Sequence, residues 1–384
     1  VTFVHDPERE DTLSYNEINA FFQDRGGIIW VGTPNGPNKI YPRRQQFFHE
    51  AFDPRNPKSL SSNKVHSFLY DYDGNLWVGT DNGLNRRPRR RRGFVQYVHE
   101  PADNTTLLGN EINGMVMDYD KRVWIGGNGG LNLYNPEKDN FVRFTKGVGE
   151  FQLTTVLTIG LDESGRLWLG NESKDEGIQV LDPESGKMKY FDSDTVDGLH
   201  SNSVFVIQSD SHGRLWMGTE EGLAYYMPEE KRFRTYVNDE EDHYSLPSNL
   251  VTNIHEDGDE NLWFGTLKSI CKYDRAEDRF IRYGAYQGLG IESVFGLTSD
   301  RSGMLWISHE RGITKYNPTT QTAIHYNFAD GLNNKFFWGS VYRGKDGRLY
   351  FGGLNGFNHF HPDMFKTNNH IPPVVFTRYH AGRE

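Results

Sequence analysis

Several features that often reveal how a protein works are scarce in this sequence. Its 384 residues include one cysteine, Cys271, so no intrachain disulfide can form. No run of 18 apolar residues occurs, which excludes a membrane-spanning helix within it. The formal net charge is −10, whereas a general nucleic-acid binder would carry a basic surface. Long stretches with a 3.6-residue apolar period are missing too, so we expect almost no helix.

Sequence patterns for metals and cofactors are also missing. Neither a His-x-x-x-His pair nor paired cysteines point to zinc. The repeated Asp-x-x-Gly turns bring one carboxylate each, whereas calcium takes about six to eight oxygen ligands. The Gly-Gly and Gly-Thr pairs lack the spacing of a phosphate-binding loop. We therefore predict no metal and no cofactor.

What the sequence has in quantity is aromatic residues, at 14%, and 41 glycines. They recur in one pattern: an Asp- and Gly-rich turn, an apolar residue, an aromatic, an apolar residue, a glycine and a small residue. Eight copies centre on Trp30, Trp77, Trp124, Trp168, Trp216, Trp263, Trp306 and Tyr350. Successive aromatics lie 47, 47, 44, 48, 47, 43 and 44 residues apart. A fixed period in this range is the signature of a repeat architecture.

Each copy predicts four short antiparallel strands. In one unit, residues 65–70 alternate with a period of two, and residues 76–80 are continuously apolar and hence buried on both faces. Turns rich in Asp, Asn and Gly separate these strands from a third and an outer fourth strand. Four such strands form one blade of a β-propeller. We predict an all-β fold, a single β-propeller of four-stranded antiparallel blades over residues 1–361, with the repeated Trp between blades.

The two ends of the sequence bear on the number of blades. Residues 3–7 (FVHDP) align with the end of an outer strand at 97–101 (YVHEP). The last unit, 336–361, has three strands and then continues into Pro362 instead of a fourth. We therefore expect eight blades, the last closed by the N-terminal outer strand. The alternative is seven blades plus an extra unit.

The repeat resembles the regulator-propeller repeats of periplasmic sensor domains in bacterial hybrid two-component systems. Residues 63–84 and 202–223 match that pattern almost throughout, and residues 53–63 are similar to the family's connection between blades. Residues 371–377 (IPPVVFT) look like the opening strand of the small β-sandwich that follows such propellers. The resemblance thus implies that residues 362–384 are a linker and the first strand of a truncated C-terminal sandwich.

The resemblance also implies a function. Family members are periplasmic ectodomains of inner-membrane proteins that sense a ligand, usually an oligosaccharide from polysaccharide breakdown. They pass the signal to a kinase or cyclase, which would lie outside this sequence, and the full receptor can be a homodimer. We expect no enzyme activity, no nucleic acid, and membrane contact only through segments absent here. A propeller-fold polysaccharide lyase or glycosidase and a protein-interaction platform are the alternatives, since a fold does not determine function.

Candidate site residues follow from propeller geometry. The segments before the first strands and the turns between second and third strands share one face around the central channel. There the sequence places amide and charged groups suited to sugar hydroxyls, although repeated Asn residues can simply cap turns. Positions that break the repeat rank first because the fold does not require them. The candidate ligand-binding residues are Lys268, His309, Arg311, Trp338, Glu111, Glu220, Glu292 and Asn334.

A second candidate is a dense group of arginines. Arg86, Arg87, Arg89, Arg90, Arg91 and Arg92 are interrupted only by Pro88. Alignment with residues 135–139 places them at the hairpin between a third and a fourth strand, on the opposite face. They are either a solvated hairpin or a surface for an acidic protein, membrane phosphate or sulfated glycan.

Overall fold

The computed structural model describes residues 4–5, 7, 12–24, 28–40, 47–291, 293–332 and 336–365, without the side chains of 329 and 337–339. The chain divides into two compact units, residues 1–46 and 47–384. In the described part the only helices are three 3-10 turns, η1 (Ala285–Gln287), η2 (Phe328–Asp330) and η3 (Pro362–Met364). None of the described helices is long and apolar enough to cross a membrane.

The first unit contains one three-stranded antiparallel sheet. Its strands are β1 (Ala20–Gln23), β2 (Ile29–Thr33) and β3 (Gly36–Ile40), with β2 in the middle. Trp30 on β2 lies opposite Phe22 on β1 and Lys39 on β3. The first repeat of the sequence therefore forms the inner three strands of a blade.

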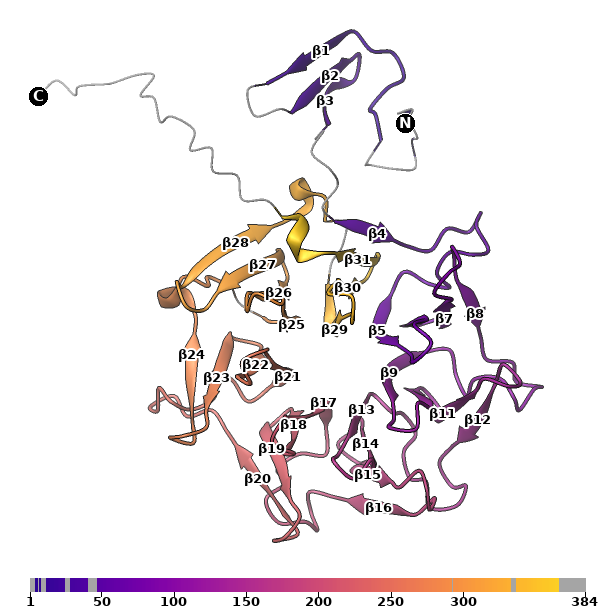
Figure 1. The fold of residues 1–384 in the computed structure, drawn as a ribbon, viewed down its shortest axis with the longest axis vertical. Coiled ribbons are helices and arrows are strands. Elements are labelled where there is room, and N and C mark those ends of the chain that lie inside the picture. Colours follow the sequence, from indigo (N-terminus) through magenta and orange to yellow (C-terminus); the bar gives the residue numbers. More distant parts are fainter. Residues whose placement is uncertain are drawn as a thin grey trace, which may run out of the picture. The chain divides into compact units, whose positions relative to one another are not determined.

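The second unit contains seven four-stranded antiparallel sheets arranged in a ring (Figure 1). Blades 1 to 3 are β5 (Val65–Tyr70), β6 (Leu76–Thr80), β7 (Gly83–Arg87), β8 (Val95–Tyr97); β9 (Ile112–Met117), β10 (Val123–Gly127), β11 (Gly130–Asn135), β12 (Asn140–Phe144); and β13 (Thr158–Leu161), β14 (Leu167–Gly170), β15 (Ile178–Leu181), β16 (Met188–Phe191). Blades 4 and 5 are β17 (Val204–Ser209), β18 (Leu215–Thr219), β19 (Gly222–Met227), β20 (Arg232–Tyr236); and β21 (Val251–Glu256), β22 (Leu262–Thr266), β23 (Ile270–Asp274), β24 (Arg279–Tyr283). Blades 6 and 7 are β25 (Gly296–Ser299), β26 (Leu305–His309), β27 (Gly312–Asn317), β28 (Thr322–Tyr326); and β29 (Phe336–Arg343), β30 (Leu349–Gly353), β31 (Gly356–Phe360), β4 (Phe48–Glu50).

The all-β propeller of four-stranded blades is confirmed, but the expected closure is wrong. The outer strand of the last blade is β4, which pairs with β31 through His49 opposite Asn358, and not the segment at residues 3–7. Phe47, fully buried, anchors β4 by an edge-to-face contact with Phe360 at 4.9 Å. The first strands β29 and β5 then lie side by side, so seven blades close the ring within residues 47–365. The alternative of seven blades plus an extra unit describes the chain.

One hydrogen bond recurs in the turn of nearly every repeat. The indole Nε1 of Trp77 donates to Oδ2 of Asp71 at 2.8 Å, and the other carboxylate oxygen accepts the backbone N–H of Asn75. The same Trp–Asp bond occurs in blades 2 to 6 at 2.8–2.9 Å. In blade 7 the partners are replaced together: Gly344 stands in place of Asp, and Tyr350 in place of Trp. The Asp-x-x-Gly turn is therefore a structural device that orients the aromatic ring.

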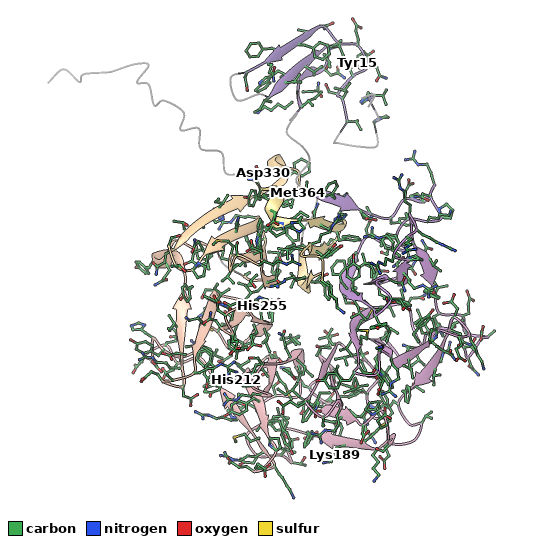
Figure 2. The ribbon with its side chains drawn as sticks, in the orientation of Figure 1. Tyr15, Lys189, His212, His255, Asp330 and Met364 are labelled. Atoms are coloured by element: carbon green, nitrogen blue, oxygen red, sulfur yellow. The ribbon has the colours of Figure 1, made fainter. Side chains whose placement is uncertain are left out.

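The cores lie between blades, as expected. Trp216 of blade 4 packs with Phe264 and Phe280 of blade 5. The repeated aromatics of the other six blades of the ring likewise pack with residues of the next blade, and side chains lie between the sheets around the ring (Figure 2). Tyr350 of blade 7 packs with Val78 of blade 1, which completes the ring of cores. A buried Trp of this kind removes about 150–250 Å² from water, so these contacts are a main source of stability.

Candidate functional site

The turns between second and third strands and the segments before first strands do share one face. In blade 1 the N–H of Asp81 donates to the carbonyl of Lys64 at 3.2 Å. The N–H of Gly83 donates to the carbonyl of Asn110, in the next blade, at 2.6 Å. Gly83 has φ of 116°, and a Cβ there would lie 2.6 Å from the carbonyl oxygen of Tyr97, which explains the glycine of the repeat. We call this surface the loop face.

The asparagines repeated on the loop face have a structural role. The side-chain oxygen of Asn63 accepts the N–H of Phe52 at 2.8 Å, and that of Asn110 accepts the N–H of His99 at 2.7 Å. Asn202 and Asn249 accept in the same way from Ser193 and Asn238. Each bond ties the connection between two blades to the following first strand, as expected of turn-capping residues.

Lys268 and Arg311 are the exposed cations among the candidates. Both lie on the loop face, in the turns that follow β22 and β26. The N–H of Lys268 donates to Oγ1 of Thr266 at 3.2 Å, which shapes its turn. One guanidinium N–H of Arg311 donates to the carbonyl of Gly290 at 3.2 Å. Their charged ends are thus presented to solvent on two neighbouring blades.

His309 occupies a different environment from its neighbour Arg311. Its side chain is only 4% exposed, and Nε2 lies 2.8 Å from Oγ1 of Thr314. Nδ1 accepts the N–H of Arg311 at 3.3 Å. Burial, together with the nearby charges of His325 and Arg311, lowers the pKa of His309 to about 4, so the ring is neutral at pH 7. His309 stands where blades 1, 4 and 5 have Thr, and it holds the turn that carries Arg311.

The remaining candidates are only partly described. Glu111 and Glu220 are half-buried on the loop face, and Glu220 forms an ion pair with Lys174 at 3.1 Å. Glu292 and Asn334 lie outside the described residues. Trp338 belongs to β29, but its side chain lies outside the described part. Their roles in binding stay predictions, as do those of Lys268 and Arg311.

Sequence reasoning missed the long turn of blade 3 on the loop face. Residues 171–177 separate β14 from β15, whereas residues 81–82 suffice in blade 1. Glu176, 7% exposed, holds this turn by accepting from Lys146 Nζ and Thr154 Oγ1, both at 2.8 Å. Burial alone would raise the pKa of Glu176, but these bonds outweigh it and hold the pKa below its usual range. The sequence did contain a sign of this long turn. Residues 171–177 (NESKDEG) replace the short turn seen at residues 80–83 (TDNG), and Trp168 lies 44 residues after Trp124 and 48 before Trp216.

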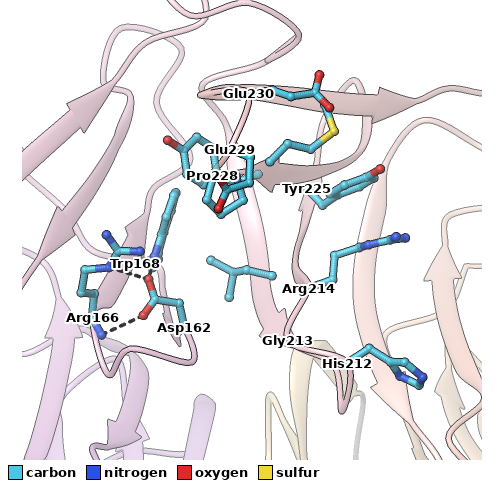
Figure 3. A pocket seen from close by; sticks show the side chains of 13 residues that line it. Asp162, Arg166, Trp168, His212, Gly213, Arg214, Tyr225, Pro228, Glu229 and Glu230 are labelled. Atoms are coloured by element: carbon cyan, nitrogen blue, oxygen red, sulfur yellow. Dashed lines mark hydrogen bonds and ion pairs between the residues drawn. The ribbon is translucent and has the colours of Figure 1, made fainter.

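A cavity of about 380 Å³ lies at the other end of the strands, in the seam between blades 3 and 4 (Figure 3). Trp168, Tyr225 and Pro228 supply apolar walls, and Arg166 and Arg214 lie on opposite sides. In the next seam the residue at the position of Pro228 is Arg275, which bonds to Asp210 and Glu256 at 3.0 and 3.3 Å.

The six arginines lie at the β7–β8 hairpin and its base, at the end of the strands opposite the loop face. The N–H of Arg89 donates to Oδ1 of Asn75 in the turn between β5 and β6, which confirms that these two loops share a face. Among the described residues, no group of three or more His, Cys, Asp or Glu is arranged to hold a metal ion.

Comparison with protein families and curated proteins identifies related sequences. A model of the two component regulator propeller matches residues 12–35, 59–82, 106–129, 198–221 and 245–268. Histidine kinase P4 of Formosa agariphila is 32% identical over 100 residues, which are 26% of this chain and 7% of that protein.

Solved structures share the fold over most of the chain. The extracellular domain of a hybrid two component system from B. thetaiotaomicron matches with a TM-score of 0.80 and 26% identity, over 98% of this chain and 49% of that one. The extracellular domain of a one component system from the same organism matches with a TM-score of 0.68 and 20% identity, over 95% and 48%. A virginiamycin B lyase from Staphylococcus aureus, at 12% identity and a TM-score of 0.61, shares the fold alone, over 82% and 98%. The chain spans about half the length of the two extracellular domains.

Proposed function

Because the chain is built from two-component regulator propeller repeats, we propose that it is the ligand-sensing part of a periplasmic domain in a membrane-bound bacterial signalling protein. The ligand is an oligosaccharide released by polysaccharide breakdown. The signal passes to a kinase or cyclase domain elsewhere in the full protein, which functions as a homodimer.

The observation that carries this proposal is the likeness to the extracellular domain of a hybrid two component system. This likeness extends over 98% of the chain at 26% identity. It therefore includes both the ring and the first unit. The lyase match has only 12% sequence identity and carries no argument for enzyme activity.

The loop face is our choice for the oligosaccharide site. Sugar hydroxyls are recognised by side chains that donate and accept hydrogen bonds on a concave surface. Lys268 and Arg311 supply exposed donors on blades 5 and 6, and Glu220 with Lys174 supplies a charged pair on blades 3 and 4. The repeat does not need these residues, because other blades form the same turns without them.

Titration calorimetry with a panel of uncharged oligosaccharides of several lengths tests the proposal. We expect binding without turnover, and a loss of roughly tenfold or more in affinity for Lys268→Ala and Arg311→Ala, since a hydrogen bond from a charged group is lost. Lys189→Ala, an exposed lysine on the outer strand β16, is the matched control and should bind normally.

Two results would contradict the sensor assignment. New reducing ends or unsaturated products after incubation with polysaccharides would indicate an enzyme. Retention of a protein partner together with no binding of any oligosaccharide would indicate an interaction platform.

A further inference from the structure

The six arginines of blade 1 separate into two groups with different environments. Arg86 bonds to the hydroxyl of Tyr134, lies 3.4 Å from Asp139 and stacks over Trp77. Arg87 forms an ion pair with Glu50 of the closing strand β4. Both are partly buried and have carboxylate partners, so these two arginines stabilise the ring.

Arg89, Arg90, Arg91 and Arg92 are all exposed. Within the described part of the chain, none of the four guanidinium groups lies in an ion pair with a carboxylate. The exposed Lys58 packs against Gly93 and adds a fifth cation beside them. Like charges on one short loop repel one another, so a bound anion would stabilise this loop.

The loop that carries these arginines is held at three points. The N–H of Arg91 donates to the carbonyl of Pro88 at 3.0 Å, and that of Arg89 donates to Asn75 at 3.2 Å. The N–H of Phe94 donates to the carbonyl of Lys58 at 2.8 Å. The charged side chains are therefore displayed from a defined backbone, which lowers the entropic cost of binding.

The equivalent hairpins of blades 2 to 5 each have a small net negative charge, and that of blade 6 has no charged residue. In blades 2 to 5 the acidic residues outnumber the basic ones: the charged residues are Glu137, Lys138 and Asp139; Asp182, Glu184 and Lys187; Glu229, Glu230 and Lys231; and Arg275, Glu277 and Asp278. The hairpin therefore folds equally well with acidic residues. The basic tip in blade 1 is not required by the fold, in a chain of net charge −10.

An aromatic residue lies beside this basic tip. Tyr72, 62% exposed, belongs to the same turn as Asn75, and Nζ of Lys121 from blade 2 lies 3.7 Å from its ring centroid. The turn also contains one exposed carboxylate, Asp73. We define the basic hairpin surface as Lys58, Tyr72, Arg89–Arg92 and Lys121. It combines an aromatic ring with guanidinium and ammonium groups that can donate hydrogen bonds.

We propose that the basic hairpin surface binds a sulfated polysaccharide chain. Guanidinium groups match the oxygen pairs of sulfate and carboxylate, and an exposed tyrosine offers a flat surface to a sugar ring. A flat anionic membrane would also approach the acidic hairpins of blades 2 to 5, whereas a narrow chain can contact blade 1 alone. The choice of a glycan rests on the proposed sensor function, but this site is separate from the loop face.

Fluorescence anisotropy with a labelled heparin-derived hexasaccharide tests the proposal on the full chain. The variant combines Arg89→Ser, Arg90→Ser, Arg91→Ser and Arg92→Ser. The control removes four exposed lysines from other blades and so changes the net charge equally: Lys138→Ser, Lys187→Ser, Lys189→Ser and Lys345→Ser. We expect the arginine variant to bind about tenfold or more weakly and the control to stay within about twofold of wild type.

Salt and lipid measurements complete the test. Raising NaCl from about 50 to 300 mM should weaken wild-type binding about tenfold, because exposed charges are screened. Equal loss in both variants, or no binding of the hexasaccharide at low salt, would overturn the proposal. Binding to vesicles of anionic phospholipid with none to the hexasaccharide would overturn it in favour of a membrane. If uncharged oligosaccharides fail to bind the loop face, the sensor proposal fails, but the hexasaccharide experiment still tests the basic hairpin surface because it uses a different ligand.

Discussion

The first and second repeats carry nearly the same sequence, yet their tryptophans differ in environment. Trp77 is fully buried, and all five residues of β6 are buried with it. Trp30 is half-buried, and only Val31 and Thr33 of β2 are buried within its unit. Both indoles nevertheless bond to the turn carboxylate, Trp30 to Asp24 at 3.1 Å. The turn bond is therefore a local property of the repeat, whereas burial requires blades on both faces.

The largest expected effect separates the two tryptophans directly. Trp77→Ala should lower the free energy of unfolding of the ring by about 4 kcal/mol, because it removes a large side chain from a packed core. Trp30→Ala should change it by less than about 1 kcal/mol. Urea denaturation followed by circular dichroism measures both. Equal destabilisation by the two variants would contradict the comparison.

The turn carboxylate provides the next largest effect. The Asp210 side chain is fully buried, where it accepts from Trp216 at 2.9 Å and pairs with Arg275 at 3.0 Å. Asp210→Asn should cost about 3 kcal/mol, because it removes a buried carboxylate that binds both Trp216 and Arg275 and leaves Arg275 only Glu256 as a charged partner. Asp24→Asn in the first unit, with its half-buried indole, should cost much less in the same urea experiment. A small effect of Asp210→Asn would show that the ion pair contributes little.

Acid should destabilise the ring with a smaller effect per residue. Burial lowers the pKa of His309 and of His255, whose Nε2 lies 2.8 Å from Oγ of Ser299, to about 4. The unfolded chain takes up these protons near pH 6.5, so stability falls as the pH drops from about 6.5 to 4. His309→Asn should make this decline of the melting temperature shallower. An unchanged slope between pH 6.5 and 4 would contradict a neutral buried His309.

The carboxylates of the turns extend the same dependence to lower pH. Burial raises the pKa of Asp162 and Asp210, but bonds from Trp168 and Trp216 outweigh it and hold both pKa values below their usual range. The two carboxylates therefore stabilise the fold fully above the pKa of an Asp in the unfolded chain, which is about 4. This stabilisation is lost as the pH falls further.

Much of the fold could be predicted because its signals are local. Residues 65–97 show a period-two strand, a turn, a continuously apolar strand and a second turn in order, and each became the expected strand. The ring closure could not be predicted in this way. Residues 3–7 and residues 48–50 both look like outer strands, and only the contacts of Phe47 with Phe360 and of Glu50 with Arg87 select the second.

The candidate site was only partly accessible from sequence for the same reason. Lys268 and Arg311 lie on the loop face as expected, because turns alternate between the two ends of a hairpin-connected sheet. The burial of His309 depends on Thr314, a residue of the following strand whose sequence shows no sign of this contact. The cavity beside Trp168 is lined by residues of two blades, which no single repeat reveals.

The sequence by itself determined the blades, their order and the phase of their aromatics, because hairpins and Asp–Trp turns form between residues close in the chain. Only the tertiary structure decided that seven blades close on β4, and that Arg86 and Arg87 are structural while Arg89–Arg92 stay exposed. These outcomes depend on residues that are distant in sequence. Similar outer strands and similar arginines are distinguished only by the partners that the closed ring places beside them.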